Sequence, residues 1–338
     1  MAIIEIRKEI QKSPVEDEVS ALIAVVRPIL LGLLLSLKKD VADRLGGYGK
    51  VELFMLARNR LKGDGDVGVC YEYAVHDAVR RGDPKVLERV EDALKKCKVP
   101  GSQLNSILFA AEKNGVLALI DTARELITDE SRVLTGKKHQ PPKLKTHIQG
   151  LFDAFHKQGA RLALPESING LWKADLFLGT TDQDRWVGTT VKINALQLEA
   201  ANGLRVGIVP ARYGKSDKIV KDDKKNMIVC PLPYDGSFVE TFYHAWAIVL
   251  QVFNADCELP KEVHLPTPAH RHVAKELVSR RHFPVMDIIE ALEPLAQPHL
   301  LDTDVAQDEV DTGVVDPAQT LTKTVIAPVS LPVPEKAA

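Results

Sequence analysis

Hydrophobic and polar residues alternate along two neighbouring stretches of the chain, Leu171–Gly179 and Arg185–Ile193. Alternation at every second residue is typical of a strand with one buried face, and the Gly, Thr, Asp and Gln residues between the stretches are typical of a turn. We therefore predict a β-hairpin here. Apolar runs at Leu204–Pro210 and Met227–Leu232 predict two further strands.

Helical periodicity, with apolar residues three and four positions apart, fills most of the remaining chain. Residues 15–45 predict a long helix or a pair of helices broken at Pro28. After a flexible turn at residues 62–68, residues 70–128 are predicted to be almost wholly helical. The helices expected from there on are Tyr71–Arg81, Lys85–Lys96, Leu104–Lys113, Val116–Ile127, His147–Lys157, Leu196–Asn202, Phe238–Phe253, Ala269–Arg280 and Val285–Leu292.

This order of elements predicts an α/β fold, with a mixed central sheet flanked by helices and an added N-terminal helical region. We expect an N-terminal helical region over residues 1–65 and an α/β core with a helical insertion over residues 66–260. Residues 261–300 would add C-terminal helices. Residues 301–338 carry seven acids against two lysines without apolar periodicity, and we expect an acidic disordered tail.

Composition narrows the functional classes. The 338 residues have a net charge of −2, so the whole molecule is no generic binder of polyanions, and any nucleic-acid surface must be local. Four widely spaced cysteines form no CxxC pair, which argues against a zinc finger or a disulfide framework and fits a cytoplasmic protein. The apolar run Pro28–Leu37 is too short to span a bilayer, so we expect no membrane anchor. Motifs for nucleotide hydrolysis, dinucleotide binding, zinc proteolysis and serine hydrolysis do not occur.

The predicted hairpin carries an acid on its first strand, Asp175, and a lysine near the end of its second, Lys192. A carboxylate and an ammonium on adjacent strands can converge on one point. There the acid would hold a divalent cation, and the ammonium would stabilise the negative charge that develops during phosphodiester hydrolysis. The alternative is that both side chains simply face solvent.

The residues WKAD, ending at Asp175, and TVK, ending at Lys192, resemble the motif of the restriction-endonuclease-like, or PD-(D/E)XK, nuclease superfamily. The family pattern places an acid on one strand and an acid, any residue and a lysine on the next. The resemblance covers mainly residues 68–250. It departs from the pattern at Thr190, which stands where a second metal-binding acid is expected.

The resemblance also implies a glutamate on the first core helix that reaches toward the metal, and Glu72 in GVCYEYAVHDAV matches that position. Glu72 lies beside the apolar stripe of its helix, where a carboxylate is costly to bury without a partner. It could equally reach solvent. Gln197 and Glu199, on the helix expected after the lysine strand, could replace the missing acid. The implied cofactor is Mg²⁺ or Mn²⁺, with Asp175, Glu72 and Glu199 as candidate ligands.

Two basic segments stand on either side of the hairpin in the sequence. Residues 132–161 contain seven Lys or Arg against one acid, and residues 205–225 contain seven against three. They could be solvated loops, or they could contact a phosphate backbone. We expect the clusters His270–His272 and Arg280–His282 to lie at the surface. We expect His244 and Trp246 to lie in the core.

Together with the resemblance, these observations predict a cytoplasmic, metal-dependent DNA endonuclease acting in restriction or defence. Restriction-like enzymes that cut both strands commonly work as dimers, so a homodimer is one assembly that the resemblance allows. The second reading is a catalytically silent nuclease-fold protein that binds nucleic acid or a partner protein, as Thr190 suggests. A third reading, a structural helical oligomer, rests on residues 15–61 alone.

Overall fold

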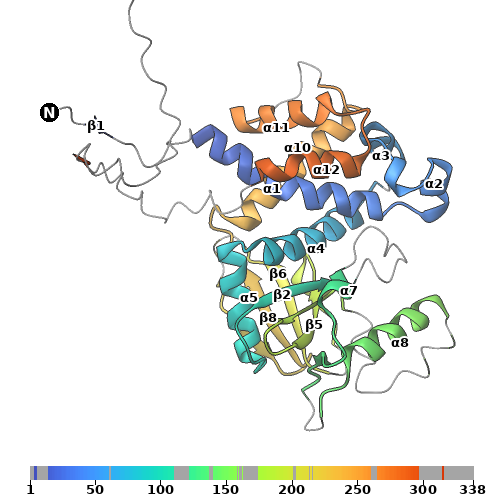
Figure 1. Ribbon diagram of the computed structural model, residues 1–338, viewed down its shortest axis with the longest axis vertical. Helices are drawn as coiled ribbons and strands as arrows, with labels where there is room; N and C mark the ends of the chain where they lie inside the picture. The colour runs from blue at the N-terminus through green and yellow to red at the C-terminus, as the bar shows by residue number, and fades with distance from the viewer. Residues whose placement is uncertain are drawn as a thin grey trace, which may run out of the picture. The chain divides into compact units, whose positions relative to one another are not determined.

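A computed structural model gives the architecture of the chain (Figure 1). It describes residues 4–5, 14–60, 62–109, 122–136, 140–157, 159, 162, 174–200, 203–212, 214, 216–259, 265–296 and 314–315. The chain divides into two compact units, residues 14–301 and the two terminal segments 1–13 and 302–338. In the terminal unit, β1 (Ile4–Glu5) pairs antiparallel with β9 (Val314–Val315). The rest of the expected acidic tail lies outside the described residues.

The larger unit is an α/β fold with a mixed seven-stranded sheet flanked by helices, which confirms the predicted fold class. Its strands are β2 (Leu104–Leu108), β3 (Arg132–Val133), β4 (Leu176–Thr180), β5 (Arg185–Val191), β6 (Arg205–Pro210), β7 (Val220–Asp222) and β8 (Met227–Leu232). Its helices are α1 (Pro14–Leu35), α2 (Lys39–Arg44), η1 (Tyr48–Lys50), α3 (Leu53–Asn59), α4 (Asp64–Arg81), α5 (Pro84–Lys96), α7 (Thr122–Leu126), α8 (Leu144–His156), η4 (Ala195–Gln197), α10 (Phe238–Asn254), α11 (Pro268–Ser279), α12 (Val285–Leu292) and η5 (Glu293–Leu295).

The sheet has an antiparallel half and a parallel half that meet at β5. Strands β2, β4 and β5 form an antiparallel meander, whereas β5, β6 and β8 run parallel, and β7 adds an antiparallel edge. The short strand β3 pairs with the start of β5, and β6 pairs with its end. The hairpin between β4 and β5 is tight at Gly179, where a Cβ atom would overlap the carbonyl oxygen of Arg185.

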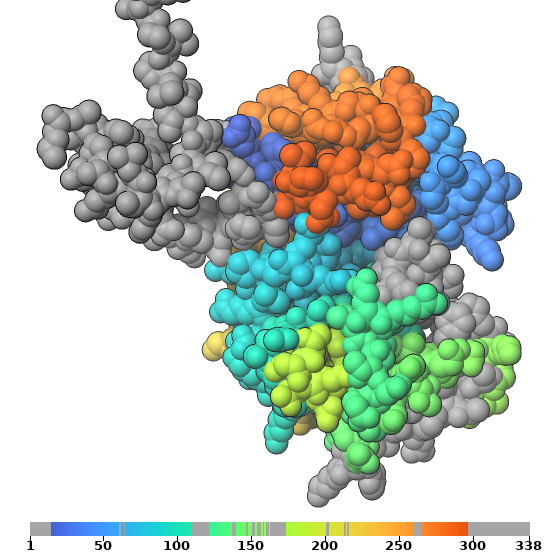
Figure 2. Space-filling view, viewed as in Figure 1, coloured from blue at the N-terminus to red at the C-terminus, as the bar shows by residue number. Residues whose placement is uncertain are grey.

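Helix α4 lies between the sheet and a layer formed by α1, α10, α11 and α12 (Figure 1). In Figure 2 the C-terminal helices, in orange, and the N-terminal segment, in blue, form a continuous layer above the cyan α4. Helix α1 continues through Pro28 rather than breaking there, and its apolar residues are buried in the main core. It is also the one described helix whose length and composition would allow it to cross a membrane. Because most of it is buried against other helices, the core accounts for its apolar character.

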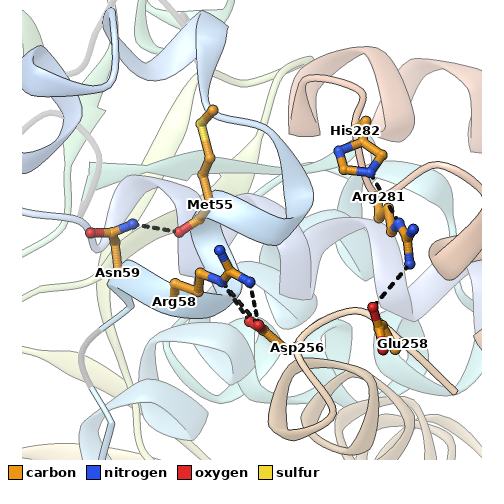
Figure 3. Close-up of polar contacts among 7 residues, drawn as sticks. All are labelled: Met55, Arg58, Asn59, Asp256, Glu258, Arg281 and His282. Atoms are coloured by element: carbon orange, nitrogen blue, oxygen red, sulfur yellow. Dashed lines mark hydrogen bonds and ion pairs between the residues drawn. The ribbon is translucent and has the colours of Figure 1, made fainter. Parts of the chain in front are cut away.

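Ion pairs connect residues at the surface of this helical layer (Figure 3). The guanidinium of Arg58, on α3, holds both carboxylate oxygens of Asp256, just after α10. Nearby, Arg281 lies 3.6 Å from Glu258 and donates to His282. A buried pair lies deeper: Arg60 Nη1 is 3.0 Å from Asp66 Oδ2. The pair of Arg58 and Asp256 therefore connects an N-terminal helix to the C-terminal helices, in addition to the apolar contacts between them.

Three of the predicted elements are wrong. Residues 104–108 form the strand β2 rather than a helix, because all five residues pair with β4. The predicted flexible turn at residues 62–68 largely belongs to α4, which begins at Asp64 and includes two glycines. Within the described residues, the predicted helix Leu196–Asn202 is only the single turn η4, and the carbonyl oxygen of Glu199 accepts from Arg205. The predicted helix Val116–Ile127 lies mostly outside the described residues.

Candidate functional site

Three of the side chains singled out in the sequence converge on one point. The ammonium of Lys192 lies 2.8 Å from Glu72 Oε1 and 2.9 Å from Asp175 Oδ2. Glu72 comes from α4, Asp175 from the residue before β4, and Lys192 from the residue after β5. A helix and the two strands of the hairpin therefore bring together residues that are far apart in the sequence.

Backbone hydrogen bonds fix the position of Asp175. Its N–H donates to the carbonyl oxygen of Thr189 at 2.8 Å, and its Oδ2 accepts from the N–H of Val191 at 3.0 Å. Asp175 is only 8% exposed, so the reading that it faces solvent is wrong. The alternation in the sequence suggested a strand residue. The structure instead places Asp175 at a bend just before β4, from which its carboxylate reaches across β5.

Lys192 is positioned in a similar way by the parallel half of the sheet. Its N–H donates to the carbonyl oxygen of Ile208 on β6 at 2.9 Å. Burial acts to lower the pKa of Lys192, but the charges of Asp175 and Glu72 outweigh burial and raise it. The lysine is therefore held as a cation. Its side chain is 28% exposed, more than that of either acid, so solvent reaches the site on the lysine side.

Arg205 is a fourth charged residue of the site, and the sequence reading missed it. It was counted in the second basic segment, but it lies in β6 and is 1% exposed. Its Nη1 lies 3.5 Å from the hydroxyl of Thr190, and its Nη2 donates to the carbonyl oxygen of Glu199. Burial lowers the pKa of Arg205, whereas the charges of Asp175 and Glu199 act to raise it. A guanidinium thus lies beside the residue that stands where the resemblance expects an acid.

The two residues suggested as replacements for the missing acid lie differently. Gln197 ends η4 and is exposed, and no hydrogen bond between it and Glu72, Asp175 or Lys192 is found in the described part of the chain. The side chain of Glu199 is also exposed, but it is close enough to Arg205 for its charge to act on the guanidinium. In the described part of the chain, the contacts of the Lys192 ammonium are with Glu72 and Asp175, and they do not include the side chain of Gln197 or Glu199.

The acids of the site suit a hard divalent cation in chemical type. Mg²⁺ is often held by one or two carboxylates, with water and substrate phosphate completing its octahedron. Glu72 and Asp175 could supply those two carboxylates, and the hydroxyl of Thr190 adds a neutral oxygen nearby. Among the described residues, no group of three or more His, Cys, Asp or Glu is arranged around a metal site. Any ion here would thus depend on few protein ligands.

The helix that carries Glu72 also buries a histidine against the sheet. His76 lies one turn after Glu72, and its Nδ1 is 2.8 Å from the hydroxyl of Ser106 on β2. Burial lowers the pKa of His76 to about 3, and the charge of Arg80 acts in the same direction. His76 is therefore neutral at physiological pH. It fixes the face of α4 that presents Glu72 to the sheet.

The two basic segments meet at one point next to the site strands. The N–H of Leu204, the residue just before the second segment, donates to the carbonyl oxygen of Thr135 in the first. Exposed lysines follow in both segments, including Lys145, which pairs with Asp129, and Lys221, which pairs with Asp223. Residues 137–139 and 215 lie outside the described residues. Arg205 does not belong to this surface, because it is buried.

Two histidines lie differently from the prediction. His270 is buried rather than at the surface, and it stacks edge-on at 5.1 Å against His244, which is exposed rather than in the core. Arg281 lies near Glu258 (Figure 3). His282 is exposed and lies 3.6 Å from Glu52. Comparisons of the chain with protein-family models, with curated proteins and with solved structures found no match. The functional argument therefore rests on the geometry of the site.

Proposed function

We propose that this protein is a metal-dependent phosphodiesterase that cleaves nucleic acid, with DNA as its substrate. The observation that carries the proposal is the convergence of Glu72, Asp175 and Lys192 from a helix and two adjacent strands. These are the three elements from which the restriction-endonuclease-like resemblance expects its helix glutamate, its strand acid and its lysine. The mixed sheet with helices on its faces also agrees with that resemblance.

Each residue has a role that follows from its chemistry. Asp175 and Glu72 would hold Mg²⁺ or Mn²⁺, which when bound supplies an activated water and neutralises phosphate charge. Lys192, held as a cation at the more exposed side of the site, would stabilise charge that develops on the phosphate oxygens. The exposed lysines of the basic segments would contact the nucleic-acid backbone and make binding depend on salt.

A specific observation favours a second candidate, a nuclease-fold protein that binds nucleic acid without cleaving it. The two carboxylates are matched by two cations, Lys192 and the buried Arg205. Among the described residues, both acids therefore already lie close to cations without an added ion. In addition, Thr190 offers a hydroxyl where an acid would bind the ion more strongly.

The test is cleavage of supercoiled plasmid, linear duplex, single-stranded DNA and RNA by the full chain, with Mg²⁺ or Mn²⁺. The variants are Asp175→Asn, Glu72→Gln and Lys192→Met. The matched control is Lys95→Met, because Lys95 pairs with Glu91 on the surface of α5. We expect the wild type and the control to cleave, and the site variants to lose about 10²-fold or more in rate. Salt-dependent binding without cleavage by any form would favour the second candidate, and equal cleavage by all forms would refute the assigned site.

A further inference from the structure

A cavity of about 360 Å³ lies between α1, α4, α7 and η5, on a different part of α4 from Glu72. Neither Asp175 nor Lys192 lines it. Its volume falls within the range typical of pockets that hold small molecules, about 300–1,000 Å³. Three arginines line it, Arg27 from α1 and Arg80 and Arg81 from the end of α4. This concentration of guanidinium groups is the reason to ask what the cavity binds.

Arg27, which lines the cavity, has one N–H group without a partner among the described residues. The residue is 8% exposed, its Nε donates to the carbonyl oxygen of Ile289 at 2.9 Å, and its Nη2 pairs with Glu293. Its Nη1 is buried without a hydrogen-bond partner in the described part of the chain. Burial lowers the pKa of Arg27, while the charge of Asp77 acts to raise it. A buried guanidinium N–H without an acceptor is unfavourable, so an acceptor that enters the cavity would be stabilised there.

Glu293 already shows that the arginines can hold a carboxylate together. Nη2 of Arg81 lies 3.0 Å from Glu293 Oε1 and 2.9 Å from Oε2, and Arg27 pairs with the same carboxylate. Two guanidinium groups thus hold one carboxylate, and the same N–H donors suit a phosphate or another carboxylate. The side chain of Glu293 is 55% exposed. Glu293 can therefore turn toward solvent when another oxyanion takes its place.

The charge balance of the cavity depends on Asp77. Arg27, Arg80 and Arg81 face Asp77 and Glu293, and Arg80 also pairs with Glu125 at 3.1 Å, so three carboxylates match the three guanidinium groups. Burial raises the pKa of Asp77 to about 7, against the opposing charges of Arg27 and Arg80. Near neutral pH a fraction of the molecules therefore carries Asp77 without its charge, and the arginines then have one positive charge in excess.

We propose that this cavity binds a small molecule that has a nonpolar body and one oxyanion, a phosphate or a carboxylate. The oxyanion contacts Arg27 and Arg81 and displaces Glu293. The body lies against Pro28, Leu31 and Tyr73, which supply the apolar part of the lining. This site is independent of the proposed phosphodiesterase site.

The experiment uses the full chain and four probes: phenyl phosphate, benzoate, inorganic phosphate and phenol. Calorimetry and thermal shift measure binding to the wild type and to three variants. Glu293→Gln removes the competing carboxylate, Arg81→Gln removes one guanidinium, and Arg58→Gln is the control, because Arg58 pairs with Asp256 away from the cavity. Arg27 is left in place, since its buried hydrogen bond to Ile289 supports the helical layer.

We expect saturable binding of phenyl phosphate, of benzoate, or of both, and no binding of phenol. Inorganic phosphate should bind more weakly than phenyl phosphate, because it lacks the body. Binding should be at least about threefold tighter in Glu293→Gln and at least about fivefold weaker in Arg81→Gln, with Arg58→Gln unchanged. Binding of only one of the two ring compounds identifies the oxyanion. The proposal is overturned if neither binds wild type or Glu293→Gln at about 10 mM, or if Arg81→Gln leaves the affinity unchanged.

Discussion

Replacing Lys192 by methionine removes the cation that separates two buried carboxylates. Methionine keeps the length and the apolar stem of the side chain, so the change is mainly one of charge. Glu72 and Asp175 would then lie close together, each with a side chain about nine-tenths buried and neither with the ammonium that now lies within 3 Å. Like charges in a poorly solvated site repel each other, so we expect the folded state to lose stability.

The magnitude follows from the burial of the three groups. Breaking a fully buried ion pair costs about 3–5 kcal/mol, whereas an exposed pair contributes about 0–1 kcal/mol. The acids are nearly buried, but the lysine is 28% exposed, so its contribution is reduced by solvent screening. We therefore expect Lys192→Met to lower the free energy of unfolding by about 2–3 kcal/mol. The surface control Lys95→Met should have no measurable effect.

The assay is urea unfolding of both variants and the wild type, with and without Mg²⁺ or Mn²⁺. If the two acids can hold a divalent cation, the ion should restore part of the lost stability in Lys192→Met, by about 1.4 kcal/mol at ten times its dissociation constant. Lys192→Met as stable as the wild type in metal-free buffer would refute the reasoning about the charge cluster. Loss of stability without any recovery on adding metal would refute the claim that these acids form a metal site.

Further predictions concern the fold around the site. Gly179→Ala should destabilise the protein by roughly 2–4 kcal/mol in urea unfolding, because its Cβ atom would overlap the hairpin backbone, and an unchanged midpoint would contradict this. Arg60→Met should lower the free energy of unfolding by about 3–5 kcal/mol, because it leaves Asp66 buried without its cation. Arg58→Met, at an exposed pair, should lower it much less, and equal losses in the two variants would contradict the difference in burial. As pH falls from about 6.5 to about 3, His76 should lower the free energy of unfolding, because only the unfolded chain takes up that proton, whereas Asp77, with its pKa raised to about 7, acts in the opposite direction. His76→Gln should therefore gain stability relative to the wild type as pH falls through this range, and parallel pH profiles of the two proteins would exclude the His76 contribution.

Much of the fold followed from local pattern. The alternation in the second hairpin strand and the apolar runs of β6 and β8 predicted these three strands closely. Strand β4, predicted over Leu171–Gly179, begins only at Leu176, and β4 and β5 are buried on both faces rather than on one. Residues 104–108 were predicted as helix because their apolar residues also fit a helical spacing. Pairing along the whole of β4 decides their state, and no local pattern contains that information.

The sequence pointed to the three converging residues of the candidate site, but not to the residues that surround them. Asp175, Lys192 and Glu72 were picked out by their order along the chain, and the structure brings them together. Arg205 was assigned to a basic loop, although it precedes the apolar run VGIV and begins a central strand. That position was the available signal for its burial. Its contact with Thr190 depends on the register of β5 against β6, which a sequence does not show.

The most direct test of the account is the rate at which wild type and Asp175→Asn cleave one end-labelled DNA duplex under single-turnover conditions with Mn²⁺. Asparagine keeps the shape of Asp175 and can still accept from Val191, so the fold should persist while the negative charge is lost. Cleavage by the wild type that falls about 10²-fold or more in Asp175→Asn is the predicted result. Equal rates for the two proteins, or no cleavage by a wild type that binds the duplex, would contradict a phosphodiesterase site at Lys192.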